Sequence, residues 1–146
     1  MLVRNFKQID QQAYYAMAES FYQSDAAISE IKRIQLEHTF QEIMKGSPYI
    51  KGKMLCEGDT IVGYALLVFS WSCEYDGIMV TVDELFIKDS YRSKRYGSAF
   101  FKWLEKTYVI DDYSYSLEVN PQNPRAKKLY ERLGYRSCPY IQMVKE

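Results

Sequence analysis

Apolar residues recur at helical spacing in the first third of the chain. The stretch "LVRNF" predicts a short first strand, and a helix is predicted over residues 10–22 with Asp10 as its N-cap. The residues expected on one face of that helix are Ala13, Ala16, Met17, Ser20 and Phe21. A second helix is predicted over residues 33–46, where Gly46 ends a periodic apolar pattern. That pattern consists of Leu36, Phe40, Ile43 and Met44.

The central third has the composition of strands. The runs "YIKGKMLCE" and "TIVGYALLVFSW" meet at "GD", which predicts an antiparallel hairpin. The next run, "IMVTVDELFI", has few breaks and predicts a central strand covered on both faces. Asp83 and Glu84 lie inside this run, and a buried carboxylate costs free energy unless it is paired or functional. The acid pair therefore marks a candidate site.

The last third predicts a βαβ unit. The basic segment "YRSKRYGS" separates the central strand from a helix, "AFFKWLEKTY", and a further strand, "YSYSLEV", follows. The last helix is predicted to start at Asn123 and Pro124 and to end before Gly134, and "PYIQMVK" predicts a final strand. Together these elements predict an α/β fold in a single domain, residues 1–146, with a mixed sheet of six or seven strands and about four helices.

Composition narrows the classes of partner. Lys plus Arg and Asp plus Glu both number 19, so the whole chain has no electrostatic preference for nucleic acid or an anionic membrane. No apolar run approaches the roughly 18 to 20 residues of a membrane span, and we expect a cytoplasmic protein. The three cysteines are far apart and form no CxxC pair, which argues against a disulfide framework and a zinc site. No metal is expected.

The segment "YRSKRYGS" allows two interpretations by itself. Arg92, Lys94 and Arg95 precede Gly97 and an apolar helix. They form either a solvated charge cluster or a cradle for an anion at the helix start, where backbone N–H groups and the helix dipole favour negative charge.

Two segments resemble motifs of the GNAT superfamily of acetyl-CoA-dependent N-acetyltransferases. The cofactor loop [RQ]xxGx[GA] is matched by Arg92 and Gly97, with Arg95 where the first glycine belongs. The second motif, NxxAxxLYxxxGF, is matched by Asn123, Ala126, Leu129, Tyr130, Gly134 and Tyr135. The resemblance covers roughly residues 81–135. It implies transfer of an acetyl group from acetyl-CoA to a primary amine of a small molecule or peptide.

The resemblance also implies roles for individual residues. Backbone groups of the central strand would pair with the pantetheine arm, and N–H groups of the basic loop would hold the pyrophosphate. The expected cofactor-binding residues are Leu85, Phe86, Ile87, Arg92, Ser93, Lys94, Arg95, Tyr96, Gly97, Ser98 and Asn123. Tyr130 would donate its proton to the thiolate that leaves, since a pKa of roughly 10 keeps the hydroxyl protonated at neutral pH. Because no cysteine is placed near the thioester, we expect direct attack in a ternary complex.

The acceptor amine needs a base, because only its neutral form attacks a thioester. Glu84 and Asp83 are the candidates, and neighbouring strand residues face opposite sides, so one of them is expected to face the substrate. We favour Glu84; a structural carboxylate is the alternative for either. Asp25, Glu74 and Asp76 form either an acidic mouth for a cationic amine or solvated loops.

Other interpretations follow from the departure at Arg95. If that position requires a positive φ, a non-glycine residue costs roughly 1 to 2 kcal/mol, although its guanidinium could contact a phosphate. A catalytically weak CoA-binding or protein-interaction module on the same fold is therefore the alternative function. Nucleic-acid binding is disfavoured by the zero net charge. A homodimer is compatible with exposed aromatic surface on the hairpin or the last strand.

Overall fold

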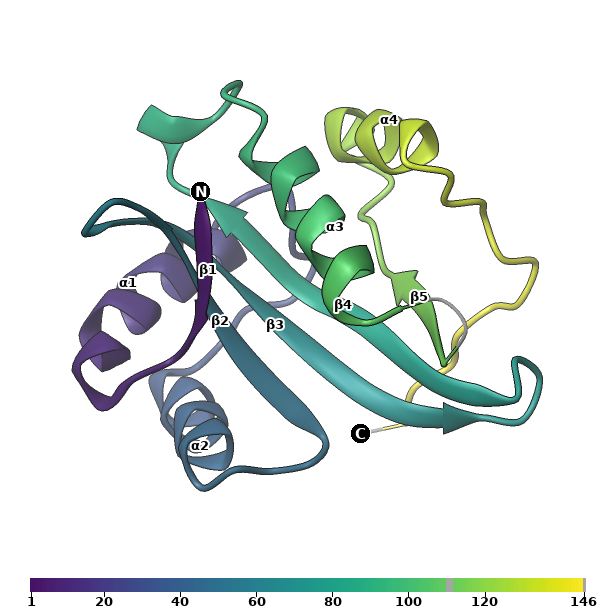
Figure 1. The fold of residues 1–146 in the computed structure, drawn as a ribbon, viewed down its shortest axis with the longest axis horizontal. Helices are drawn as coiled ribbons and strands as arrows, with labels where there is room; N and C mark the ends of the chain where they lie inside the picture. The colour runs from purple at the N-terminus through teal and green to yellow at the C-terminus, as the bar shows by residue number, and fades with distance from the viewer. Residues whose placement is uncertain (110–111, 146) are drawn as a thin grey trace.

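One mixed sheet organises the computed structural model, which describes residues 1–109 and 112–145 (Figure 1). Its five strands lie in the order β1-β2-β3-β4-β5. Their bounds are Leu2–Asn5 (β1), Ile50–Glu57 (β2), Thr60–Ser72 (β3), Gly77–Ile87 (β4) and Tyr113–Leu117 (β5). Neighbouring strands are antiparallel from β1 to β4, whereas β5 runs parallel to β4. The predicted hairpin and the predicted parallel pair are both confirmed.

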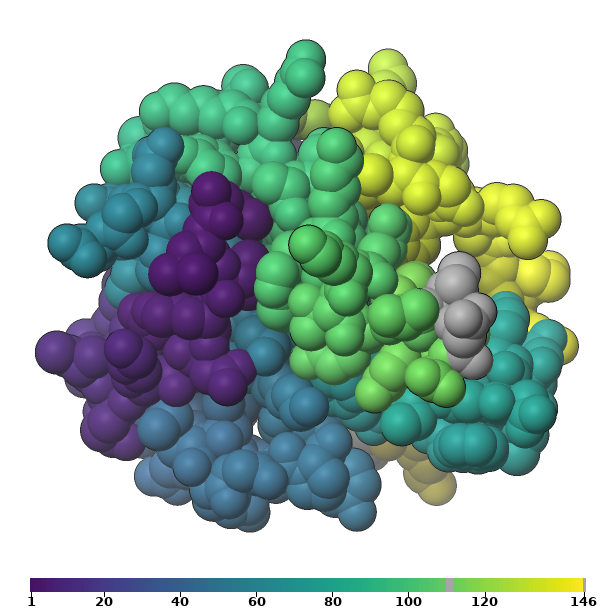
Figure 2. Space-filling model, in the orientation of Figure 1, coloured from purple at the N-terminus to yellow at the C-terminus, as the bar shows by residue number. Residues whose placement is uncertain are grey.

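In the described part of the chain, four α-helices cover the two faces of the sheet (Figure 1). They are α1 (Gln11–Tyr22), α2 (Arg33–Met44), α3 (Tyr96–Thr107) and α4 (Pro124–Arg132). Two short 3₁₀ helices, Gln8–Asp10 and Asp89–Tyr91, precede α1 and α3. Figure 2 shows residues of α3 covering the middle of the sheet face that is turned to the viewer.

Each face has its own apolar core. On the α1 and α2 face, Tyr14, Phe40 and Tyr64 are buried together. On the α3 face, Val82, Phe100 and Phe101 form the second core, and residues of α4 pack at its margin. Because α3 has fully buried residues and α4 has none, α4 is the more loosely held helix.

The count of six or seven strands was too high, because the final strand does not form. Residues 135–145 have no regular secondary structure, and Ile141 and Met143 are 87% and 90% exposed. Apolar residues with strand propensity do not make a strand unless a neighbouring strand satisfies their backbone hydrogen bonds. The predicted α/β architecture with about four helices is otherwise confirmed.

The buried face of α1 is rotated about the helix axis, by about the angle between two consecutive residues, from the face that was predicted. Tyr14, Tyr15, Met17 and Ala18 are buried, whereas Ala16 is exposed. Two large aromatic rings fill more of the core than the small residues expected there, so their burial sets the rotation of the helix. Asp10 is the N-cap residue of α1, as expected, but its side chain does not bond to an N–H of the helix: its carboxylate accepts bonds from Arg4 at 2.7 and 2.8 Å.

A helix with the length and hydropathy of a membrane span does not occur among the described residues.

Candidate active site

The sheet opens where β5 ends. The β4–β5 pairing runs only from Ile78 opposite Tyr113 to Val82 opposite Leu117, while β4 continues to Ile87. Lys88 N–H donates to the Val62 carbonyl at 2.9 Å, and bonding alternates along an antiparallel pair. Leu85 and Ile87 therefore direct their backbone N–H and C=O groups to the open side. An extended chain could pair with this edge as an additional strand.

A β-bulge at Asp83 changes which way β4 faces. Leu66 lies opposite Glu84 and Leu67 opposite Val82, so Asp83 is the extra residue. As a result Val82 and Leu85, three positions apart, both contact the core beneath α3. Bulges of this kind re-aim side chains beside binding sites. The Asp83 side chain lies at the open edge, and Glu84 faces the α1 side.

The loop before α3 has the backbone of an anion site. Ser93 and Arg95 have φ values of 67° and 63°, and Arg95 is the N-cap of α3. The first helical N–H with a partner belongs to Ala99, which donates to the Arg95 carbonyl at 3.0 Å. The N–H groups of residues 96–98 are therefore available at the positive end of the helix dipole.

Gly97 lets α3 approach α4 closely. A Cβ atom at Gly97 would lie 3.3 Å from Cδ2 of Leu129, which is tighter than most such contacts. The glycine of the loop motif is therefore explained by packing between the two helices that border the opening.

Replacing Arg95 with glycine is expected to raise the free energy of unfolding by up to about 1.6 kcal/mol. Arg95 has a left-handed backbone, which costs a non-glycine residue about 1 to 2 kcal/mol, and glycine relieves that cost. Glycine also raises the entropy of the unfolded chain, which lowers stability by about 0.4 to 1 kcal/mol and so offsets part of the gain. Urea denaturation measures the change. Arg95→Ala is the matched control, since it removes the guanidinium but keeps the strain. A glycine variant no more stable than the alanine variant would contradict strain at this position.

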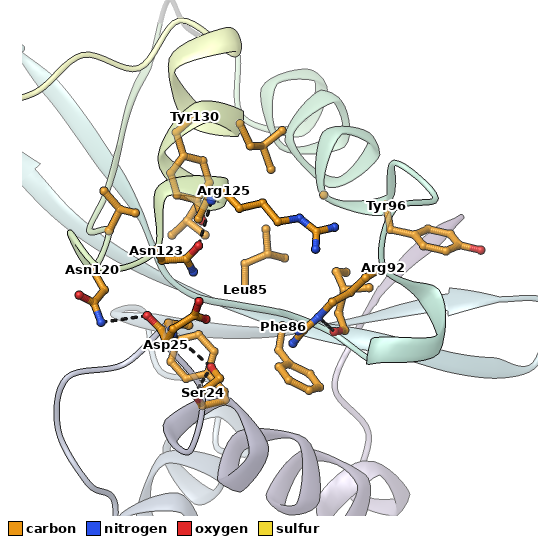
Figure 3. A pocket seen from close by; sticks show the side chains of 18 of the residues that line it. Ser24, Asp25, Leu85, Phe86, Arg92, Tyr96, Asn120, Asn123, Arg125 and Tyr130 are labelled. Atoms are coloured by element: carbon orange, nitrogen blue, oxygen red, sulfur yellow. Dashed lines mark hydrogen bonds between the residues drawn. The ribbon is translucent and has the colours of Figure 1, made fainter.

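A pocket of about 490 Å³ lies between β4, the loop before α3, and α4 (Figure 3). All but two of the predicted site residues line it. Those lining it are Asp83, Leu85, Phe86, Ile87, Arg92, Ser93, Arg95, Tyr96, Gly97, Ser98, Asn123 and Tyr130. The two others are Lys94, whose ammonium lies 4.9 Å from the centroid of the Tyr91 ring, and Glu84. The structure thus brings the two sequence motifs to one cavity.

Arginines gather around the part of the pocket formed by the loop. Arg92 donates to the Ile87 carbonyl at 3.1 Å and pairs with Asp89 at 2.9 Å. Arg125, from α4, donates to Ser93 Oγ at 3.1 Å and so connects α4 to the loop. Arg95 and Arg132 also line the pocket. This end of the cavity favours an anionic ligand.

Carboxylates line the same pocket, from β4, from the connection after α1 and from the residue that follows β5. They belong to Asp25, Asp83 and Glu118. The pKa of Asp83 is raised, first because the walls of the pocket reduce hydration of the carboxylate and second because Glu118 is negative. Glu74 and Asp76 lie elsewhere, exposed at the turn between β3 and β4, so of the three acids proposed for a mouth only Asp25 lies at the pocket.

Tyr130 and Asn123 border the pocket from α4 (Figure 3). Asn123 is the N-cap, as predicted: its Oδ1 accepts from Ala126 N–H at 3.0 Å. Tyr130 is half-buried, and its ring packs edge-on against Phe101 with centroids 5.6 Å apart. Burial raises the pKa of Tyr130, which keeps its hydroxyl protonated at neutral pH.

Glu84 is enclosed on the opposite face of β4. The residue is 5% exposed, and its carboxylate accepts hydrogen bonds from Tyr22 at 2.7 Å and from Tyr64 at 2.5 Å. Burial raises the pKa of Glu84, while the two phenol donors act in the opposite direction. Its carboxylate therefore lies away from the open edge where Leu85 and Ile87 present their backbone.

Several pocket residues were missed by the sequence analysis. Arg125 lies at an unspecified position of the second motif, and Glu118 directly follows a strand, so position alone could have suggested both. Asn120 donates its side-chain amide to the Asp25 carbonyl at 2.9 Å. These two residues are 95 positions apart, and no local pattern predicts that contact.

The chain was compared with protein families, with curated sequences and with solved structures. The model of the acetyltransferase (GNAT) family matches residues 11–135. No curated protein sequence matches the chain. A possible acetyltransferase from Clostridium difficile 630 has a TM-score of 0.84 and 17% identity, over 99% of this chain and 96% of that one.

Two further solved structures share the fold. The ribosomal-protein-alanine N-acetyltransferase from Brucella melitensis biovar Abortus 2308 has a TM-score of 0.77 and 14% identity, over 100% of this chain and 99% of that one. The aminoglycoside N-acetyltransferase AAC(6')-Iy, solved with CoA, has a TM-score of 0.78 and 10% identity, over 99% of this chain and 93% of that one. At these identities the likeness establishes the fold.

Proposed function

Because this chain belongs to the acetyltransferase (GNAT) family, we propose that it transfers an acetyl group from acetyl-CoA to a primary amine by direct attack in a ternary complex. The family match confirms the resemblance predicted from the loop and helix motifs, and with it acetyl-CoA as the co-substrate of the family. The observation that supports the proposal best is the pocket itself, where an open strand edge, a loop of free N–H groups and Tyr130 meet.

The residues of the pocket fit acetyl-CoA. Leu85 offers a backbone donor and acceptor, and Ile87 a backbone donor, to an amide-containing arm, and Asn123 lines the same pocket at the start of α4. The N–H groups at the start of α3, with Arg92, Arg95 and Arg125 nearby, suit the phosphates. When bound, acetyl-CoA supplies the activated acyl group, and the chain orients it.

Tyr130 and Asp83 are proposed to handle the two protons of the reaction. The amine nitrogen bonds to the acetyl carbon, and the bond from that carbon to sulfur breaks. Tyr130 donates its proton to the departing thiolate, and Asp83 accepts the proton that the amine loses, directly or through water. The sequence favoured Glu84 as the base; the enclosure of Glu84 by two tyrosines supports Asp83 instead.

A cationic amine is the proposed acceptor class. Asp25, Asp83 and Glu118 place three carboxylates at the pocket, and a second ammonium on the acceptor would interact favourably with those that do not serve as base. The neighbours that acetylate an aminoglycoside and a ribosomal protein act on amines, which is consistent with this class. A single domain, a cytoplasmic location and a possible homodimer stay part of the proposal.

A thiol-release assay with acetyl-CoA and a panel of amines tests the function. We expect CoA thiol to be released faster with diamines, polyamines or aminoglycosides than with monoamines of similar size that carry no second positive charge. Thermal denaturation with and without CoA is the companion measurement, because a ligand that binds the folded state raises the melting temperature. No melting shift at millimolar CoA would refute the assigned site.

The alternative function is a CoA-binding module without turnover. The strained Arg95 in the loop is the observation that favours it, since it replaces a glycine that lets the backbone approach phosphate. A melting shift with CoA but no thiol release with any amine class, peptides included, would select this alternative.

A further inference from the structure

The Glu84 carboxylate connects two layers of the molecule. One phenol donor, Tyr64, belongs to the neighbouring strand β3, and the other, Tyr22, is the last residue of α1. A third tyrosine, Tyr14, is fully buried beside them, with its ring 5.3 Å from that of Tyr64. A buried carboxylate retains its charge at lower cost when each oxygen accepts a donor, so the cluster fixes the end of α1 to the centre of the sheet.

The chain that follows Tyr22 forms one wall of the pocket. Residues 23–32 connect α1 to α2 without a helix or strand, and Ser24, Asp25 and Ala26 of this connection line the pocket. On the far side, the Asn120 amide donates to the carbonyls of Asp25 and Ala27 at 2.9 and 3.5 Å, the first of which is drawn in Figure 3. The connection is thus fastened at two points, by Glu84 through Tyr22 and by Asn120.

We propose that Glu84, through Tyr22, and Asn120 are positioning residues that hold residues 23–27 in place as the acceptor wall of the pocket. The identity of the acceptor in this inference rests on the proposed function, whereas the contacts that hold residues 23–27 do not. Neither residue acts on the reacting atoms. Each acts through the wall that presents the Asp25 carboxylate to a cationic amine.

The matched pair Tyr22→Phe and Tyr64→Phe tests the role of Glu84. Both variants remove one phenol donor from the same carboxylate, but only Tyr22 is continuous with the pocket wall. Tyr22→Phe is expected to raise KM for the amine about tenfold, the size of one charge-assisted hydrogen bond, with KM for acetyl-CoA unchanged. Tyr64→Phe is expected to leave both KM values unchanged.

Asn120→Ala is the second, independent variant. Asn120 lies outside the buried cluster of Glu84 and the tyrosines, so this substitution leaves the packing of that cluster intact. It is expected to raise KM for the amine in the same way. Native-state hydrogen exchange gives a readout that needs no turnover: amides of residues 23–27 should exchange about tenfold faster in Tyr22→Phe and Asn120→Ala, and at the parent rate in Tyr64→Phe.

The outcomes separate this inference from the proposed function. Equal changes in Tyr22→Phe and Tyr64→Phe, or unchanged exchange of residues 23–27 in Tyr22→Phe, would overturn the positioning role. If no amine is acetylated, the enzymatic proposal fails while the exchange measurement still decides whether Glu84 and Asn120 hold the wall.

Discussion

Tyr130→Phe is expected to lower kcat by about 10²- to 10⁴-fold and to leave CoA binding unchanged. Tyr130 lines the pocket, and burial raises its pKa, so its hydroxyl keeps the proton that the proposal assigns to the departing thiolate. The phenylalanine ring retains the edge-on contact with Phe101. Steady-state kinetics with saturating acetyl-CoA and amine measures the loss, and the melting shift with CoA verifies that the site is intact.

Tyr135→Phe is the matched control for this substitution. Tyr135 packs against the same Phe101 ring at 5.6 Å, and its hydroxyl is buried with no hydrogen-bond partner among the described residues. Removal of that hydroxyl should leave kcat near the parent value. If both variants lose activity equally, the effect comes from the aromatic cluster and Tyr130 is not the acid.

Asp83→Asn is expected to lower kcat/KM for the amine by about 10²-fold at neutral pH and to abolish the acid limb of the pH profile. The proposed base acts as the carboxylate, so the parent rate should fall as pH drops through the pKa of Asp83. That pKa is raised by the pocket walls and by Glu118, and the limb should therefore lie at higher pH than for an unperturbed aspartate. The pH dependence of kcat/KM measures it.

Two other variants test whether Asp83 is the base. Glu118→Gln removes the neighbouring charge, so it should move the acid limb to lower pH and preserve it. Glu84→Gln should keep the limb in place, because Glu84 is enclosed away from the open edge. Loss of the limb in Glu84→Gln with retention in Asp83→Asn would return the role of base to Glu84.

Local sequence signals predicted the parts of the site that depend on backbone conformation. Asn123 and Gly134 define the two ends of the last helix, and the structure places both as expected, with a φ of 90° at Gly134. Arg95 replaces the motif glycine at a position that has a positive φ, which is the condition under which the sequence predicted strain. These features depend on a few neighbouring residues, so one sequence is enough to predict them.

Features that depend on packing across the chain could not be predicted. The assignment of Asp83 and Glu84 to faces required counting along β4, and the bulge changes that count in a way that only the partner strand reveals. The contact from Asn120 to the connection after α1 links distant segments. The C-terminal residues illustrate the opposite case, where strand propensity was present and a pairing partner was not.

The bulge in β4 also has an evolutionary consequence. Adjacent strand side chains face opposite sides, and the bulge in addition leaves Asp83 without a partner in β3, beside the pocket, while Glu84 is bound to Tyr22 and Tyr64. Residue 83 is therefore constrained by the proposed reaction, in which it is the base for any amine acceptor. Residue 84 can change without loss of stability only together with its two phenol partners, because a single substitution leaves buried polar groups unpaired. Neighbours in sequence are thus expected to be retained for different reasons, one by the reaction and one by the core.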